Sequence, residues 1–308
     1  MYFPYFRGRQ YELLALKELA TSKLITCSVT PIVEPVKLIP ALNSSLAAFK
    51  NSNLPLGLIL NPNVGDLADE AETINQLIDR LGTSETAIPS VLLNESAEAA
   101  MIKLAQKGVQ KNDILAVLNN RDYLDVYHDL FSETLPRYTL CPDERIIRRS
   151  ISKDKVLFEN RFNKQSRNAD YPEDEFFSDD HLYYRDDNYT GFGDYSIVGD
   201  EYIESGFAPY AVAIHIVYFA EADSLRIKHF ISDSNDDISD VAGKFYEAVS
   251  KLYNWYTNGQ ERQITIGLQT LLNHYSNRTY PGLPTLKKLS IMHHLELMGK
   301  YLDGRLDA

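Results

Sequence analysis

The sequence predicts an α/β fold built on a TIM-barrel-like repeat of strands and helices. Short, continuously apolar runs recur along the first half of the chain, which is typical of parallel strands buried on both faces. Amphipathic segments of helical period separate these runs. Such strand–helix units require a parallel sheet with right-handed crossovers. An open doubly wound sheet would satisfy this pattern too, but eight strand candidates favour the closed barrel.

The expected strands follow one another at regular intervals. They are Leu24–Val36, Leu56–Leu60, Ser90–Leu93, Ile114–Leu118, Tyr138–Cys141, Val156–Glu159, Tyr195–Val198 and Tyr210–Phe219. The first is rich in Ile, Thr and Val, residues enriched in strands, and prolines bound the second. The last is also expected to form a β-hairpin with Leu225–Ile231 across a short polar turn.

Apolar residues three and four positions apart predict the helices. These are Leu13–Leu19, Leu67–Leu81, Ala97–Ala105, Leu124–Phe131, Val241–Tyr256, Leu268–Tyr275 and Leu286–Leu302. For the helix at 67–81, Gly82 supplies a stop signal. We therefore expect residues 1–308 to form a single barrel-like domain, in which residues 168–204 are an acidic, tyrosine-rich insertion or lid.

Composition excludes several classes of protein. Of the 308 residues, 44% are hydrophobic and 24% charged, as in ordinary globular proteins rather than disordered or fibrous ones. No apolar run approaches the roughly 20 residues that cross a bilayer, and the N-terminus does not resemble a secretory signal. The two cysteines, Cys27 and Cys141, form neither a disulfide framework nor a metal motif. A cytoplasmic protein without a membrane partner is expected.

Charge is distributed unevenly along the chain. The net charge of −12 opposes binding to nucleic acid. Residues 145–167 are the exception, because they carry eight basic residues against two acidic ones, beginning at Arg145 and ending at Arg167. Residues 170–204 carry twelve acidic residues and one arginine. The basic stretch is thus either a nucleic-acid surface or the partner of the acidic stretch.

Polar residues stand at the carboxyl ends of the predicted strands, where ligands gather in parallel sheets. We expect these side chains to surround one mouth and to bind a polar ligand; they are Glu34, Asn61, Asn94, Asn119 and Arg161. The alternative for the asparagines is helix capping, and Glu34 is alternatively a structural acid. His215 is a further ligand-binding candidate, although its place between Ile214 and Ile216 is typical of a buried, hydrogen-bonded histidine.

Acidic residues at the strand ends also allow a catalytic interpretation. Glu34, Glu159 and Asp194 are the candidate catalytic acids. In a metal-dependent phosphoester hydrolase, Glu34 and Asp194 would bind Mg²⁺ or Mn²⁺ and Arg161 would neutralise phosphoryl charge. The sequence has no phosphate-binding glycine motif and no nucleophile elbow. Whether the protein is an enzyme is left open.

Longer sequence stretches resemble a known family. The segments "VTPIVEPVK", "NADYPEDEFFSDDHLYY", "GFGDYSIVGDEY", "GFAPYAVAIHIVY" and "LRIKHFISD" resemble the beta-protein family, as does the opening "YFRGRQYELLALKEL". That family is bacterial and phage-borne, has no assigned activity, and occurs among mobile elements and defence-type gene neighbourhoods. The resemblance implies a barrel-like α/β fold and a neighbouring nuclease-like companion protein. It carries over no catalytic residue.

Three functions are consistent with these observations. The leading one is a cytosolic component of a defence-type or mobile-element system, which binds a polar ligand or partner protein at the barrel mouth. The second is the phosphoester hydrolase, with nuclease or phosphodiesterase activity. The third is a structural oligomerisation module that associates through the helices Val241–Tyr256 and Leu286–Leu302.

Overall fold

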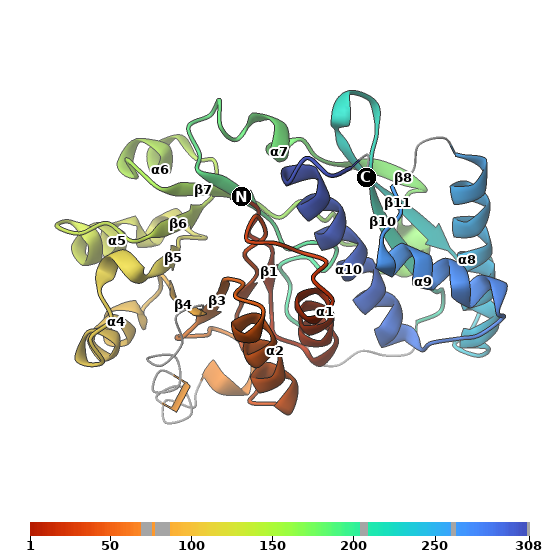
Figure 1. Ribbon diagram of the computed structural model, residues 1–308, viewed down its shortest axis with the longest axis horizontal. Coiled ribbons are helices and arrows are strands. Elements are labelled where there is room, and N and C mark those ends of the chain that lie inside the picture. Colours follow the sequence, from red (N-terminus) through yellow and green to blue (C-terminus); the bar gives the residue numbers. More distant parts are fainter. Residues whose placement is uncertain (69–75, 78–86, 204–208, 260–262, 307–308) are drawn as a thin grey trace. The chain divides into compact units, whose positions relative to one another are not determined.

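Eight parallel strands form the main sheet in the computed structural model, which describes residues 1–68, 76–77, 87–203, 209–259 and 263–306 (Figure 1). Each strand pairs in parallel with the next along the order β1-β2-β3-β4-β5-β6-β7-β9. The strands are β1 (Tyr5–Phe6), β2 (Ile32–Val33), β3 (Leu56–Ile59), β4 (Ala87–Leu92), β5 (Leu115–Val117), β6 (Tyr138–Cys141), β7 (Lys155–Phe158) and β9 (Gly191–Gly193).

The two edges of this sheet meet, so that the barrel is closed. Phe3 N–H donates to the Phe192 carbonyl and Tyr5 N–H to the Asp194 carbonyl, both at 2.8 Å. Tyr2 and Phe192 are bridged in parallel, and their rings stack at 5.2 Å. The arrangement of the eight parallel strands thus confirms the expected TIM-barrel-like fold.

Glycines in β9 permit the close approach. A Cβ on Gly193 would lie 2.4 Å from the Phe3 carbonyl oxygen, and one on Gly191 would lie 2.8 Å from that of Met1. Inward-facing side chains fill the barrel below its mouth. They are Phe3, Tyr5, Ile32, Ile59, Ile88, Leu92, Leu115, Val117, Leu140, Val156, Phe158 and Tyr195.

Helices follow the strands and cover the outside of the barrel (Figure 1). They are α1 (Gln10–Thr21), α2 (Pro40–Asn51), α4 (Ala97–Gln106), α5 (Leu124–Phe131) and α6 (Arg145–Ser150). α1 and α2 pack side by side. Most of the helix expected at residues 67–81 lies outside the described residues. Short 3₁₀ helices occur at Asp66–Ala68, Lys111–Asp113, Arg121–Tyr123, Asn168–Asp170 and Glu221–Asp223.

The rest of the chain forms a second compact unit. The barrel unit comprises residues 1–160 and 183–195, and the second unit comprises residues 161–182 and 196–308. The expectation that residues 1–308 form a single barrel-like domain stays a prediction. The acidic stretch 168–204, expected as one insertion, contributes to both of them, because its middle part supplies the closing strand β9.

An antiparallel sheet and three helices build the second unit. The sheet has the order β10-β11-β8, with β10 at Ala213–Phe219, β11 at Leu225–Ile231 and β8 at Asp174–Ser178. A one-turn helix, α7 (Asp180–Tyr183), follows β8 at the division between the units. The helices are α8 (Val241–Asn258), α9 (Ile266–Ser276) and α10 (Leu283–Leu302). Side-chain caps begin two of them, because Asp240 accepts from Gly243 N–H and Thr265 from Leu268 N–H.

Helix α10 is unusually buried for a terminal helix. It packs on α9 and β10, and its residues from Leu289 to Gly299 are all buried. The third functional hypothesis requires these apolar side chains to be exposed for an oligomer interface. Their burial removes that argument for α10, and association between copies stays a prediction.

Three strand predictions were wrong at specific positions. The run Leu24–Val36 contributes only the short strand β2, because the backbone turns at residues 27–28 within the run. Tyr195–Val198 is not a strand; the eighth barrel strand is the glycine-rich segment immediately before it. Tyr210–Phe219 was expected in the barrel, but β10 pairs with β11 in the separate antiparallel sheet. The expected hairpin with Leu225–Ile231 is confirmed.

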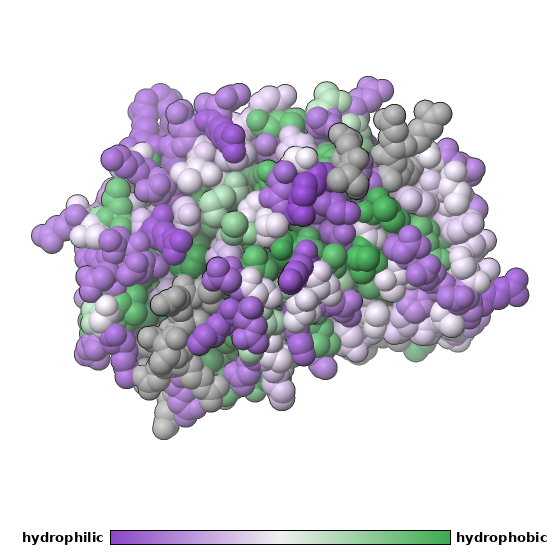
Figure 2. Space-filling view, viewed as in Figure 1, coloured by the Kyte–Doolittle hydropathy of each residue, from purple (hydrophilic) through white to green (hydrophobic). Residues whose placement is uncertain are grey.

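The surface over α4 to α6 is largely hydrophilic, with apolar side chains dispersed among polar ones (Figure 2). Ile102 on α4 and Ile146 on α6 are examples of such exposed apolar residues. Isolated residues of this kind are ordinary on protein surfaces. No helix within the described ranges combines the length and apolarity needed to span a bilayer.

Barrel closure leads to a prediction about Gly193. Gly193→Ala forces a Cβ against the Phe3 backbone, and we expect it to lower the free energy of unfolding by about 2–4 kcal/mol. Urea denaturation measures this loss. The control is Gly108→Ala, because a Cβ at position 108 would meet nothing within 4 Å and only the left-handed φ of +81° opposes it. We expect this control to lower the free energy of unfolding by about 1–2 kcal/mol. Equal losses in the two variants would contradict a special role for Gly193.

Candidate functional site

Parallel pairing places the carboxyl ends of all eight barrel strands at one end of the barrel, which we call the mouth. Polar residues follow strand after strand there. In chain order they are Arg7 after β1, Glu34 after β2, Asn61 after β3, Asn94 after β4, Asn119 after β5, Glu159 after β7 and Asp194 after β9. The side chains differ in burial and in the direction they face, and this decides which of them share a site.

Glu34 is the centre of a buried polar cluster at the mouth. Its side chain is completely buried and extends from the same side of its strand as the core residue Ile32. Tyr5 O–H donates to Glu34 Oε2 at 2.8 Å, and Asn63 N–H donates to Oε1 at 2.7 Å. Arg7 completes the cluster with an ion pair to Oε2. Glu34 therefore joins the ends of β1, β2 and β3.

Aromatic rings as well as Glu34 contact the guanidinium of Arg7. Its guanidinium carbon lies 5.5 Å from the ring centre of Tyr5 and 5.7 Å from that of Tyr195. Burial lowers the pKa of Arg7, but Glu34, Tyr5 and Tyr195 together outweigh this effect and raise the pKa of the guanidinium above its ordinary value. Burial, reinforced by Glu34, raises the pKa of Tyr5 well above 10. The cluster thus consists of a neutral phenol and a charged Arg–Glu pair.

The asparagines at the mouth differ in their backbone partners, and Asn61 Nδ2 also donates to Asn94 Oδ1 at 3.1 Å. Asn61 braces two strands, because its side chain donates to the Leu92 carbonyl at 2.8 Å and accepts from Leu92 N–H at 2.9 Å. Asn94 Oδ1 accepts from Ser96 N–H at 3.0 Å, next to the start of α4. Asn119 is exposed at the end of β5. Of these three, Asn119 has the side chain best placed to meet a ligand from solvent.

The candidate catalytic acids do not converge. Glu159 and Asp194 each adjoin an inward-facing core residue, Phe158 or Tyr195, so extended backbone directs the two acids outward. Glu159 Oε1 accepts from Asp143 N–H, and Asp194 Oδ1 accepts from Tyr2 O–H. Within the described parts of the chain, no three His, Cys, Asp or Glu residues are grouped to hold a metal ion. The metal site predicted for the pair Glu34 and Asp194 stays a prediction, since this finding concerns groups of three or more residues.

A buried thiol also lies near the mouth. Cys141 is the last residue of β6 and is fully buried. Burial raises the pKa of its thiol to about 12, so that at neutral pH it is protonated and a poor nucleophile. Covalent catalysis through Cys141 is therefore disfavoured.

The two remaining candidates, Arg161 and His215, belong to the second unit. Arg161 makes a two-pronged ion pair with Asp180, at 2.8 Å from Nε and 2.7 Å from Nη2. Its expected place at the barrel mouth stays a prediction. His215 Nδ1 lies 2.7 Å from His229 Nδ1, which agrees with the expectation of a hydrogen-bonded histidine within a strand.

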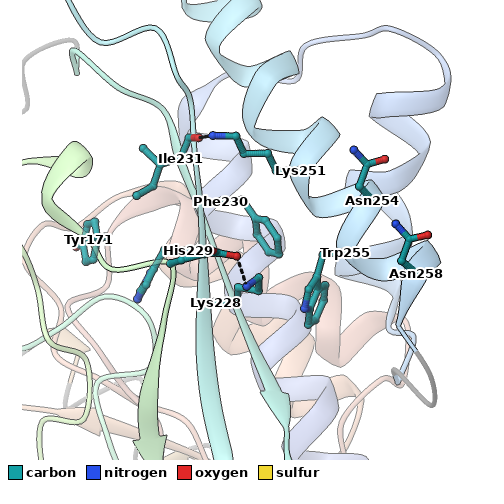
Figure 3. A pocket seen from close by; sticks show the side chains of 10 residues that line it. Tyr171, Lys228, His229, Phe230, Ile231, Lys251, Asn254, Trp255 and Asn258 are labelled. Atoms are coloured by element: carbon teal, nitrogen blue, oxygen red, sulfur yellow. Dashed lines mark hydrogen bonds and ion pairs between the residues drawn. The ribbon is translucent and has the colours of Figure 1, made fainter.

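Among the described residues of the second unit, two cavities are relevant here. The larger, of about 720 Å³, is lined by aromatic, lysine and asparagine side chains, including Tyr171, Lys228, His229 and Trp255 (Figure 3). Its lysines are paired, Lys228 with Glu173 and Lys251 with the Ile231 carbonyl. The smaller, of about 430 Å³, is lined by His215 and also by Tyr171. Neither cavity was predicted from the sequence.

Arg7 and Tyr5 were the mouth residues that sequence reasoning missed. Tyr5 belongs to the two-residue strand β1 and Arg7 directly follows it; such a strand is too short for periodicity to indicate. The alternation of the aromatic residues Phe3 and Tyr5 before Arg7 was the one available signal.

Comparison with known proteins found no matching family model, curated protein or solved structure. The resemblance to the beta-protein family accordingly has no support from these comparisons and stays a prediction.

The Arg7–Glu34 pair leads to a prediction about stability. Arg7→Met leaves the carboxylate of Glu34 buried without its cation, and we expect a loss of about 3–5 kcal/mol in the free energy of unfolding. Adding Glu34→Gln removes the uncompensated charge and should restore part of that loss. Urea denaturation of the two single variants and the double variant forms a double-mutant cycle. Strictly additive losses would contradict a coupled pair.

A second prediction concerns thiol reactivity. Cys27 is exposed and Cys141 is buried, so Ellman's reagent should label one thiol quickly in the folded protein and both after unfolding. Absorbance of the released thionitrobenzoate measures the two phases. Rapid labelling of a folded Cys27→Ser variant would show that Cys141 is reactive after all.

Proposed function

We propose that this protein binds a small polar ligand, or a polar side chain of a partner protein, at the mouth of its barrel. The observation that carries the proposal is the buried cluster of Glu34, Arg7 and Tyr5 at the carboxyl ends of β1 and β2. Ligands of barrel proteins bind at this end. The setting in a bacterial defence-type or mobile-element system, with a nuclease-like companion, rests on the family resemblance alone.

Energetics favours a role in binding over a role in folding alone. A buried ion pair contributes little net stability, because desolvation offsets most of its Coulombic attraction. Apolar side chains would fill the same space at comparable stability. The cluster instead holds a guanidinium in one orientation between two tyrosine rings, and a guanidinium of fixed geometry recognises planar acceptors such as carboxylates. We therefore expect the ligand to carry a carboxylate or a similar acceptor group.

The phosphoester hydrolase is not favoured by any observation on the mouth, since its three acids are directed to different sides of the barrel wall. Glu34 is also engaged by three protein donors, which leaves its oxygens poorly disposed toward an ion.

The test compares two asparagines at opposite ends of the same strand. Asn119 follows β5 at the mouth, and Asn112 precedes it at the other end; both are exposed. Small molecules retained through native purification would be released by denaturation and identified by mass spectrometry. Asn119→Leu should weaken binding of the retained compound about tenfold, because a hydrogen-bonding amide is replaced by an apolar side chain. Asn112→Leu should bind as the wild type does.

Two outcomes would count against the proposal. One is a wild-type protein that retains no small molecule and, in pull-down from its native host, enriches no protein. The other is a retained compound whose affinity Asn119→Leu and Asn112→Leu reduce equally, which would place the binding site away from the mouth.

A further inference from the structure

Three side chains form a continuous hydrogen-bonded row across the antiparallel sheet of the second unit. Glu175 lies on β8, His229 on β11 and His215 on β10, and the two histidines are direct partners in the β10–β11 register. His229 Nε2 lies 3.0 Å from Glu175 Oε1, and His229 Nδ1 lies 2.7 Å from His215 Nδ1. The row belongs to the second unit and plays no part in the function proposed above.

Aromatic rings enclose the two histidines. Tyr171 stacks on His229 with ring centres 4.7 Å apart and meets His215 edge-on at the same distance. The ring centres of Phe162 and His215 lie 5.3 Å apart. Figure 3 shows Tyr171 and His229 on the side of β11 that faces away from Trp255. These ring contacts hold both imidazoles in place.

The row dictates where its protons lie when both imidazoles are neutral. Burial lowers the pKa of His229, although Glu175 opposes this, and burial lowers that of His215 well below its ordinary value. An ionised carboxylate only accepts hydrogen bonds, so His229 donates to Glu175 from Nε2. Its Nδ1 must then accept, and His215 must donate from Nδ1. The other nitrogen of His215, Nε2, consequently carries a lone pair.

That lone pair belongs to a residue that lines a cavity. His215 borders the cavity of about 430 Å³ together with Lys287, Ser166 and Gln165. The charge of Lys287 acts on the imidazole and contributes to lowering its pKa. No protein donor described in the structure reaches His215 Nε2, and this atom is not among the buried polar atoms without partners. The cavity thus offers an obligate hydrogen-bond acceptor close to a positive charge.

We propose that this cavity binds a protonated oxyanion, of the chemical class of a phosphate monoester, whose O–H donates to His215 Nε2 while its negative charge faces Lys287. Glu175 and His229 are positioning residues, which hold His215 in the accepting tautomer. Apolar residues on the same cavity wall, Ile197 and Leu286 among them, would contact the organic part of such a molecule.

The first experiment determines the tautomers directly. Long-range ¹H–¹⁵N correlation spectra of the histidine-labelled protein at pH 7 distinguish protonated from unprotonated ring nitrogens, and His215→Phe identifies the signals of His215. We expect protonation at Nδ1 of His215 and at Nε2 of His229. In Glu175→Ala the preference at His229 should weaken, whereas His274, which pairs with Thr279 instead, should be unchanged. A proton on His215 Nε2 would overturn the proposal.

The second experiment uses two anions that differ in one respect. Inorganic phosphate carries an O–H at neutral pH and sulfate does not, so an acceptor in the site should discriminate between them. Titrations followed through the His215 Nε2 resonance should show phosphate binding at least about tenfold more tightly than sulfate. Glu175→Ala should reduce this preference, a change that mere loss of packing would not produce selectively.

The matched variants complete the test. Isothermal titration of His215→Phe should give equal, weak affinities for phosphate and sulfate. Lys287→Met should weaken the binding of both anions, and phosphate should still bind more tightly than sulfate. Equal binding of phosphate and sulfate by the wild type would refute the acceptor role of His215. Binding of neither anion would refute the ligand class. Because these comparisons are made on the wild type, they hold even if His215→Phe fails to fold.

Discussion

Backbone contact between the first and last strands of the barrel is the constraint on which the mouth depends. Glycine at positions 191 and 193 lets β9 approach residues 1–5 closely enough for hydrogen bonds. Closure brings the ring centres of Tyr195 and Tyr5 to 5.3 Å from each other. The guanidinium of Arg7 lies over both of these rings. A side chain at Gly193 would therefore disturb both the closed sheet and the orientation of the guanidinium. Fold and candidate site share this contact.

Some polar side chains at the mouth are hydrogen-bonded to the protein, and others are exposed and available to a ligand. Which of the two applies depends on whether a neighbouring strand or loop presents a hydrogen-bond partner. Asn61 reaches both backbone groups of Leu92 and so replaces ladder hydrogen bonds where β3 ends. Glu34 satisfies a backbone amide of the next loop as well as two side chains. Asn119 has no comparable position, because it is exposed at its strand end. A polar residue after a strand is therefore a candidate whose availability depends on the adjacent strand.

Burial lowers the pKa of several imidazoles in the second unit. Burial lowers the pKa of His293 to about 4, and its Nε2 donates to the Val217 carbonyl, so this histidine links α10 to β10. His215 and His229 differ because they adjoin cavities rather than solid core. The same physical effect, desolvation, lowers the pKa of His293 within the packing between α10 and β10 and that of His215 beside a cavity. The two histidines therefore differ in whether a cavity adjoins the ring, and not in residue type.

The sequence by itself determined the barrel class, most of its strands, the hairpin and the terminal helices, because buried parallel strands and amphipathic helices leave local patterns in hydrophobicity. It also indicated Glu34 as an acid at a strand end. Only the tertiary structure decided that Arg7 joins Glu34, that Glu159 and Asp194 face away from it, and that His215 meets His229 and Glu175. Those relations depend on pairing between distant segments and on which side of a strand each residue faces. A closing strand of three residues with two glycines carries too little local pattern to reveal either.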